Sequence, residues 1–141
     1  MIILDTNIVS VIYAPNHPDL PIIEAWKQNC PDHDVRVSSI SRAEISYGIA
    51  ILPEGSKKRL LADAADRFFA PLLELILPFG VREAEVYGAI VACRRAKGRP
   101  IGILDAQIAA IAKVAGAVVA TRDVSGFLDC GVPVINPYQQ V

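Results

Sequence analysis

The chain begins with Met1-Ile-Ile-Leu-Asp-Thr-Asn7, and this stretch decides which class of fold the rest can adopt. Residues 2–4 are apolar and include two β-branched side chains, which predicts a short strand buried on both faces, as in a parallel sheet. Asp5 ends the strand, and Thr6 and Asn7 open an expected helix. Sites in open α/β sheets lie beyond the carboxyl ends of the strands. Asp5 is therefore a candidate site residue, with helix capping as the competing explanation.

Length and composition favour a single domain over residues 1–141, with helices packed on a buried sheet. Hydrophobic residues make up 52% of the chain and aromatic residues only 6%, so Ala, Ile, Leu and Val supply the core rather than the aromatic side chains of a β-sandwich. The net charge of -1 gives no overall attraction to nucleic acid or membrane. Any anionic partner must therefore be held by a local basic patch or by a metal ion.

The cysteines and histidines point away from disulfide and zinc chemistry. The 3 cysteines are widely spaced and form no Cys-x-x-Cys motif, and no secretory signal peptide is recognisable, which favours a reduced cytoplasmic protein. No apolar run approaches the ~18 residues of a membrane span. His17 and His33 lack the spacing of a helical metal-binding pair, so we expect both in surface loops.

Apolar strand patterns alternate with helical patterns along the whole chain. After the first strand we expect strands near 35–38, 75–77, 117–120 and, at a sheet edge, 132–135, with a turn at 32–34. Helices are expected between them, including one that follows Ser41, a long one over 57–72, one over 81–96 and one over 106–115. This alternation predicts an α/β fold whose parallel sheet is covered on both faces.

Four acids fall where such a sheet would gather them. Asp5 and Asp123 each follow an expected strand, Glu44 lies in the first turn of a helix after the second strand, and Asp105 opens a later helix. Local explanations exist, because Ser41 and Glu44 have capping-box spacing and a carboxylate favours a helix N-terminus. Right-handed crossovers place the carboxyl ends of all parallel strands at one edge of the sheet, so we expect the four acids to lie close together there. Oxygen-only ligands suit Mg²⁺ or Mn²⁺, which nucleases use to activate water.

A basic run ends the helix expected over 81–96 and has two explanations. Cations complement the dipole at a helix C-terminus, and Gly98 is suited to the position just after it. The same run is also the best candidate in the chain for contacts with phosphate groups. Its members are Arg94, Arg95, Lys97 and Arg99.

Four segments, in order, resemble a known family over nearly the whole chain. They are Leu4-Asp-Thr-Asn-Ile-Val-Ser10, Ser41-Arg-Ala-Glu-Ile-Ser-Tyr-Gly48, Gly98-Arg-Pro-Ile-Gly-Ile-Leu-Asp-Ala-Gln-Ile-Ala-Ala110 and Thr121-Arg-Asp-Val-Ser-Gly-Phe127. The chain resembles PIN-domain ribonucleases of the VapC toxin type, near their FitB-like branch. It departs from the usual pattern at Val11 and Gly80, where relatives often carry a polar or acidic residue.

This resemblance implies a fold, an activity and partners. The fold would be a three-layer α/β/α domain, and the activity would be that of a Mg²⁺-dependent endoribonuclease, the toxin of a toxin–antitoxin pair. The metal would be held by Asp5, Glu44, Asp105 and Asp123, with the Thr121 hydroxyl nearby. The resemblance also implies a homodimer and a small DNA-binding antitoxin that covers the acidic groove.

A second reading belongs to a different class of protein. A small parallel α/β domain with Asp after its first strand is also typical of phosphatases that form an aspartyl phosphate and of receiver signalling modules. The phosphatases usually carry a second Asp where Asn7 stands, and receivers usually carry Lys where Thr121 and Arg122 stand. A binding module without activity would normally have lost one of the four acids, and none is missing.

Overall fold

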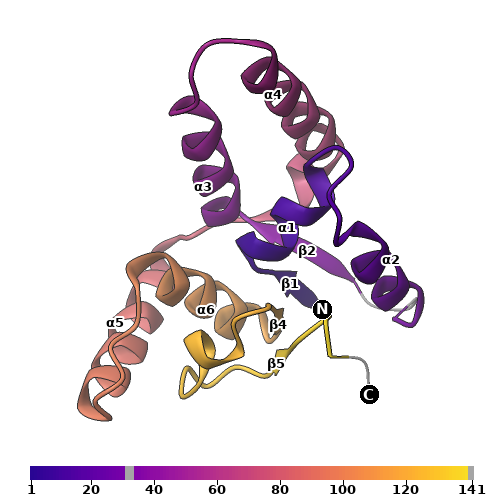
Figure 1. The fold of residues 1–141 in the computed structure, drawn as a ribbon. Coiled ribbons are helices and arrows are strands. Elements are labelled where there is room, and N and C mark those ends of the chain that lie inside the picture. Colours follow the sequence, from indigo (N-terminus) through magenta and orange to yellow (C-terminus); the bar gives the residue numbers. More distant parts are fainter. Residues whose placement is uncertain (31–33, 140–141) are drawn as a thin grey trace.

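Five strands form one parallel sheet in this computed structural model, which describes residues 1–30 and 34–139 (Figure 1). The strand order is β3-β2-β1-β4-β5, and every pairing in the described part of the chain is parallel. The expected α/β class with a parallel sheet is therefore confirmed. The strands are β1 (Ile2–Leu4), β2 (Val35–Ser38), β3 (Ile76–Leu77), β4 (Val118–Ala120) and β5 (Val134–Ile135).

The first strand lies at the centre of the sheet, which explains its uninterrupted apolar sequence. Ile3 pairs with Arg36 of β2 on one side and with Val119 of β4 on the other. The chain builds outward from β1 to β2 and β3, then returns to add β4 and β5 on the opposite side. The order of connections therefore reverses between β1 and β4, and open α/β sheets form their sites outside the carboxyl ends of the strands at such a point.

Helices cover both faces of the sheet and make three layers (Figure 1). Ile2 and Leu4 pack into one core and Ile3 into the other, because alternate side chains of a strand point to opposite faces. The first face carries α1 (Thr6–Tyr13), α2 (Leu20–Gln28), α3 (Ser39–Ala50) and α4 (Ser56–Phe69), and the second carries α5 (Val81–Ala96) and α6 (Ile103–Ala115). Two 3₁₀ helices complete the described part of the chain, η1 (Ala70–Leu75) and η2 (Val124–Phe127).

The start of α3 differs from the expected one, and the capping-box interpretation of Glu44 is wrong. The helix begins at Ser39, and the hydroxyl of Ser38, the last residue of β2, accepts a hydrogen bond from the Ser41 amide at 3.1 Å. Ser38 is therefore the N-cap, and Ser41 lies inside the first turn. Glu44 is consequently in the second turn, too far along the helix to reach the N-cap backbone.

Other element boundaries shift by a few residues. The helix expected over 57–72 ends at Phe69, and the chain tightens into η1 where Pro71 has no amide hydrogen to continue the α-helical bonding. The last long helix starts at Ile103, so Asp105 lies within its first turn rather than before it. The turn expected at 32–34 falls largely outside the described residues. No helix within residues 1–30 and 34–139 is long and apolar enough to cross a bilayer.

Candidate active site

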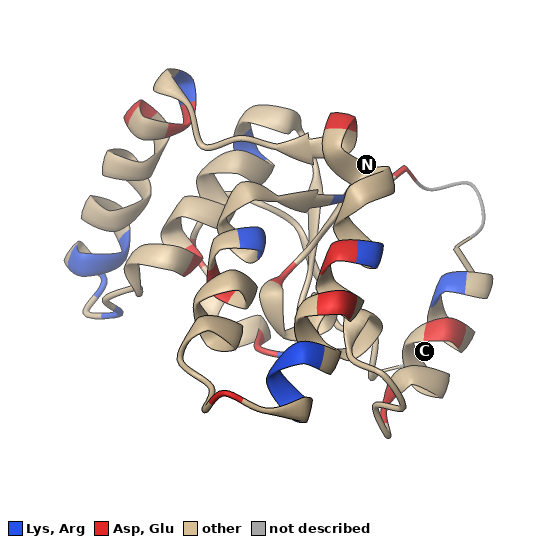
Figure 2. Cartoon of the chain, turned by 90° about the horizontal axis from the view of Figure 1, so that it is seen from above, with Lys and Arg blue, Asp and Glu red and all other residues tan. Residues whose placement is uncertain are grey.

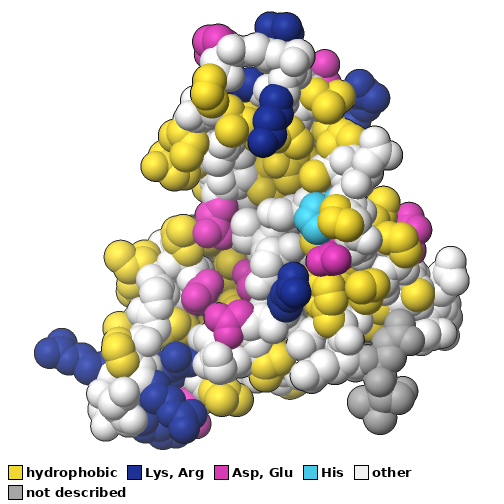
Figure 3. All heavy atoms as spheres, viewed as in Figure 1, with side chains coloured by type: hydrophobic (Ala, Val, Ile, Leu, Met, Phe, Trp, Pro, Cys, Tyr) yellow, Lys and Arg dark blue, Asp and Glu magenta, His cyan; other side chains and the backbone are white. Residues whose placement is uncertain are grey.

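Four acids converge at the carboxyl edge of the sheet, close to the point where the strand order reverses. Asp5 directly follows β1 and Asp123 follows β4, while Glu44 reaches the edge from α3 and Asp105 from α6. Their charges influence one another, since Asp105 interacts electrostatically with Asp5, Glu44 and Asp123. Figure 3 shows acidic side chains gathered around a hollow between the α3 side and the α6 side of the molecule.

Asp5 is held in a fixed orientation at the bottom of this site. Its side chain is 5% exposed. One carboxylate oxygen, Oδ1, accepts from the Thr6 amide at 2.7 Å, which makes Asp5 the N-cap of α1. The other, Oδ2, accepts from the Thr121 hydroxyl at 2.7 Å and from the Asn7 amide side chain at 3.0 Å. The capping explanation is therefore correct for one oxygen, and the second oxygen belongs to a different network.

Thr121 and Asn7 connect the ends of β1 and β4. The Thr121 hydroxyl accepts from the Asn7 side chain at 3.1 Å and from the Asp123 amide at 3.0 Å while it donates to Asp5. Asn7 also accepts from the backbone amide of Arg122 at 3.3 Å. Sequence reasoning anticipated Thr121 but not Asn7, although an Asn two positions after a strand-ending Asp was the available signal.

Glu44 is connected to the end of β1 rather than to its own helix. The Thr6 hydroxyl donates to Oε2 of Glu44 and also shares a hydrogen bond of 2.9 Å with the Ser41 hydroxyl. Thr6 therefore orients Glu44 toward Asp5. Sequence reasoning assigned neither Thr6 nor Ser41 to the site, since the spacing of Ser41 suggested a capping role.

The short 3₁₀ helix that follows Asp123 fixes the position of the Asp123 carboxylate. Its Oδ1 accepts from the Ser125 hydroxyl at 2.8 Å and from the Gly126 amide at 3.2 Å, so Asp123 is the N-cap of η2. A side chain at position 126 would place its Cβ 2.9 Å from Oδ2 of Asp123. Glycine is therefore needed there for the carboxylate to keep this position.

The site carries negative charge that no cationic side chain neutralises. Burial, reinforced by the charges of Asp105 and Glu44, raises the pKa of Asp5 to about 6, although the hydrogen bond from Thr121 opposes the rise. Burial and the charges of Glu44 and Asp123 also raise the pKa of Asp105, against the opposing influence of Arg94. Among the described residues, none of these four acids forms a salt bridge.

The donor set suits a hard divalent cation. All candidate ligands are carboxylate or hydroxyl oxygens, which Mg²⁺ and Mn²⁺ prefer. In the described part of the chain, no three Asp, Glu, His or Cys side chains lie close enough together to hold a metal ion between them. Mg²⁺ commonly uses one or two carboxylates and keeps several waters, so an open acidic site of this kind fits it.

The four cations of the basic run at the end of α5 differ in their exposure and in their contacts. Gly98 has φ 69°, and the Gly98 and Arg99 amides donate to the carbonyls of Arg95 and Arg94, the Schellman pattern that ends helices. The helix-ending interpretation is therefore confirmed. Arg94 is 5% exposed and bound to backbone carbonyls, so it does not offer its guanidinium to RNA. Arg95, Lys97 and Arg99 remain exposed near the far end of α5, at the left of Figure 2.

Comparisons with known proteins agree with this architecture. The PIN domain family model matches residues 2–129. The chain is 37% identical to "Toxin FitB" of Neisseria gonorrhoeae over 98% of this chain and 99% of that protein, and 33% identical to "VapC ribonuclease Y4jK" of Sinorhizobium fredii over 99% of each. The solved structure "FitAB bound to IR36 DNA fragment" is 35% identical, with a TM-score of 0.87 over 100% of this chain and 98% of that one. The chain therefore belongs to the PIN-domain family.

Proposed function

We propose that this protein is a metal-dependent endoribonuclease that hydrolyses RNA phosphodiester bonds with Mg²⁺, for which Mn²⁺ can substitute. The observation that carries the proposal is the convergence of four carboxylates without a salt-bridged cation. Such a site repels the phosphates of RNA unless a positive ion sits between them. The relative named as a ribonuclease supports the choice of RNA.

Asp5, Glu44, Asp105 and Asp123 would hold the cation directly or through water. When bound, the cation supplies positive charge beside the scissile phosphate and makes water more acidic. The protein's own contribution is orientation, since Thr121 and Asn7 fix one oxygen of Asp5 and Thr6 fixes Glu44. These hydrogen bonds keep the carboxylates in place before substrate arrives, so little reorganisation is needed during the reaction.

The exposed cations at the end of α5 are proposed to guide the RNA backbone. Arg95, Lys97 and Arg99 are exposed, and phosphate contacts of this kind add affinity without reading sequence. Lys97 and Arg99 both pair with Asp129, at 2.9 and 3.6 Å, so their charge is partly balanced and Arg95 is the freest of the three.

We further propose that the protein is the toxin of a toxin–antitoxin pair, forms a homodimer, and is inhibited by a small DNA-binding antitoxin that covers the acidic site. Two relatives are named as a toxin and a VapC ribonuclease, and similar solved structures are titled as complexes of FitAB and VapBC. Large apolar side chains are exposed on α3, directly after it and on α4, among the hydrophobic surface in the upper part of Figure 3, and suit a protein partner. They are Tyr47, Ile51 and Leu60, each more than half exposed.

Cleavage of RNA by the purified protein, free of antitoxin, tests the activity. We expect cleavage with Mg²⁺ or Mn²⁺ and none in EDTA, whereas undiminished cleavage in EDTA would remove the metal mechanism. Glu44→Gln is the matched variant, because the amide oxygen still accepts from Thr6 while the charge is lost. Its cleavage should fall to background with a melting temperature close to that of the wild type, and retained cleavage would exclude Glu44 from the site.

The aspartyl-phosphate alternative has less support from the geometry. A nucleophilic Asp must reach a phosphorus atom, but Asp5 is 5% exposed and both of its oxygens accept hydrogen bonds. Asn7, which stands where the phosphatases carry a second Asp, is engaged with Asp5, Thr121 and Arg122. Treatment with acetyl phosphate followed by mass measurement separates the two functions, since only the alternative gives a stable phosphorylated protein.

A further inference from the structure

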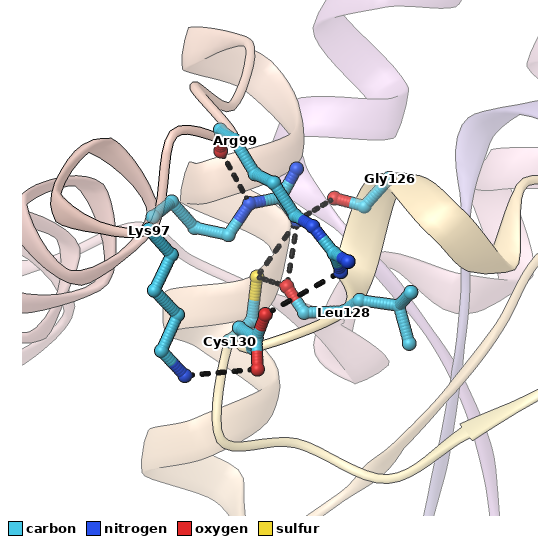
Figure 4. A network of polar contacts seen from close by, with 7 residues as sticks. Lys97, Arg99, Gly126, Leu128 and Cys130 are labelled. Atoms are coloured by element: carbon cyan, nitrogen blue, oxygen red, sulfur yellow. Dashed lines mark hydrogen bonds and ion pairs between the residues drawn. The ribbon is translucent and has the colours of Figure 1, made fainter.

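Arg94 is the one Lys or Arg side chain that is buried in the described part of the chain. It lies near the end of α5. Four residues that its guanidinium contacts, Arg99, Gly126, Leu128 and Cys130, are labelled in the network of polar contacts in Figure 4. Burying a guanidinium is costly unless its donors are satisfied. Among the described residues it has no carboxylate within salt-bridge distance, so neutral acceptors satisfy its hydrogen bonds, and its charge acts on Asp105 and Asp129 only from farther away. A buried cation whose hydrogen bonds go to backbone carbonyls suggests a role in positioning the segments that carry them.

The acceptors come from two segments that are distant in sequence. Nε of Arg94 donates to the carbonyl of Arg99 at 2.7 Å. Nη1 donates to the carbonyls of Gly126 and Leu128 at 2.9 and 2.7 Å, with a longer contact of 3.9 Å to Cys130 Sγ. The planar guanidinium has donors pointing in several fixed directions, so one side chain joins the loop before α6 to η2 and the residue that follows it.

Each of these segments leads directly to one of the acids. On one side, Gly126 accepts from Arg94 with its carbonyl and donates to Oδ1 of Asp123 with its amide. On the other side, Arg99 is bonded to Arg94 twice, since its amide also donates to the Arg94 carbonyl at 2.9 Å. The loop from Arg99 runs to the start of α6, whose first turn carries Asp105.

We propose that Arg94 is a positioning residue that sets the separation of Asp105 and Asp123 by joining the two segments that carry them. The inference rests on the proposed function, because it concerns the same carboxylates. Since the guanidinium is buried, Arg94 acts on cation affinity and on turnover, and it makes no contact with RNA. This assignment replaces the phosphate contact that the basic run suggests.

A second link between the same segments supplies a matched control. Asp129 pairs with Lys97 and Arg99 at the surface, at 2.9 and 3.6 Å, where exposed ion pairs contribute little. Asp129 has φ 60°, a conformation that Asn tolerates well. Asp129→Asn therefore removes both surface ion pairs and leaves the Arg94 hydrogen bonds in place.

Mn²⁺ binding without RNA, measured by titration calorimetry, is the first test. Arg94→Lys keeps the charge but cannot bond three carbonyls in the same geometry. Residues that orient metal ligands typically change affinity 10–100-fold, so we expect Arg94→Lys to weaken Mn²⁺ binding by about that factor and Asp129→Asn by less than about twofold. Equal Mn²⁺ affinity of Arg94→Lys and the wild type, per folded molecule, would overturn the inference.

A double-mutant cycle identifies the residue through which Arg94 acts. When Asp123→Asn is already present, adding Arg94→Lys should change Mn²⁺ affinity by less than about twofold, because no second carboxylate is left whose separation from Asp105 Arg94 could set. Independent effects of the two substitutions would mean that Arg94 does not act through Asp123. In RNA cleavage, kcat of Arg94→Lys should fall while KM and the salt dependence of KM stay unchanged; a raised KM with unchanged kcat would instead assign Arg94 to RNA binding.

Hydrogen exchange on the wild type covers the case in which Arg94→Lys does not fold. The segments 99–105 and 123–130 should open together, so that their amides exchange with the same opening free energy, and Mn²⁺ should increase the protection of both segments together. Segments that open independently would overturn the proposed link. A wild type that binds Mn²⁺ but cuts no RNA would refute the ribonuclease proposal, while the binding and exchange results still decide the role of Arg94.

Discussion

At the scale of single residues, Asp5 is the acid whose burial has the clearest energetic consequence. Its pKa rises from 3.8 to about 6, so the folded protein holds a proton that the unfolded chain releases between these values. Ionisation of Asp5 therefore destabilises the folded protein increasingly as pH rises from about 4 to 6, and the effect is fully present above pH 6. The pKa shift then corresponds to roughly 3 kcal/mol of unfolding free energy.

Asp5→Asn should remove this pH dependence when no metal is present. In EDTA at pH 7–8 we expect the variant to unfold at higher urea concentration than the wild type, with the difference disappearing near pH 4. Asn has one acceptor oxygen where Asp has two, so the variant also loses part of the three hydrogen bonds that Asp5 accepts, and this loss opposes the stabilisation. The raised pKa of Asp5 already includes the benefit that those bonds give the charged form, so we still expect net stabilisation. A variant less stable than the wild type at pH 8 would show that the hydrogen bonds dominate. RNA cleavage should be abolished.

The exposed basic residues at and just after the end of α5 lead to a separate prediction about RNA binding. The double variant Arg95→Gln, Arg99→Gln should weaken binding about equally for different RNA sequences and flatten the dependence of affinity on salt, because phosphate contacts release counterions and carry no base information. Lys57→Gln, Arg59→Gln at the start of α4 is the control, with the same loss of charge at another exposed basic cluster. A salt dependence reduced equally by both double variants would assign the effect to overall charge.

At the scale of elements, two glycines near helix ends predict opposite outcomes. Gly116, just after α6, has φ 63°, and an added Cβ would meet no atom within 4 Å. Gly116→Ala should therefore cost about 1–2 kcal/mol of unfolding free energy through backbone strain alone and leave cleavage intact. In Gly126→Ala, the new Cβ would lie 2.9 Å from Asp123 Oδ2, so cleavage should fall more than stability. Urea denaturation and cleavage rates of both variants check this contrast.

Some features of the helices and strands can be predicted from the sequence, and others depend on contacts between distant parts of the chain. The apolar run at 2–4, the acids after the strands and the glycine at 98 follow from local patterns, and the structure contains each where it was expected. The cap of α3 was misplaced because Ser38 and Ser41 are equally good candidates, and the end of β2 decides between them. The burial of Arg94 depends on carbonyls about thirty residues further along the chain, which no local pattern contains.

At the scale of the whole molecule, the acidic site predicts that divalent cations stabilise the fold. An ion that binds only the folded state adds stability by mass action, about 2.7 kcal/mol at a hundredfold excess over Kd. Mn²⁺ should therefore raise the melting temperature of the wild type and barely change that of Asp5→Asn. KCl at equal ionic strength is the control for screening, and a rise of equal size with KCl would exclude a specific ion.

The central position of β1 has a consequence for the order in which the protein is made. The first strand synthesised needs β2 on one side and β4 on the other, and β4 starts only at Val118. A growing chain carries Asp5 and Glu44 long before it carries Thr121 and Asp123. Domains generally fold as units during synthesis, so one edge of β1 stays open until nearly the whole chain has left the ribosome. If the protein cuts RNA as proposed, this delay keeps unfinished copies harmless to the messenger RNA still being translated.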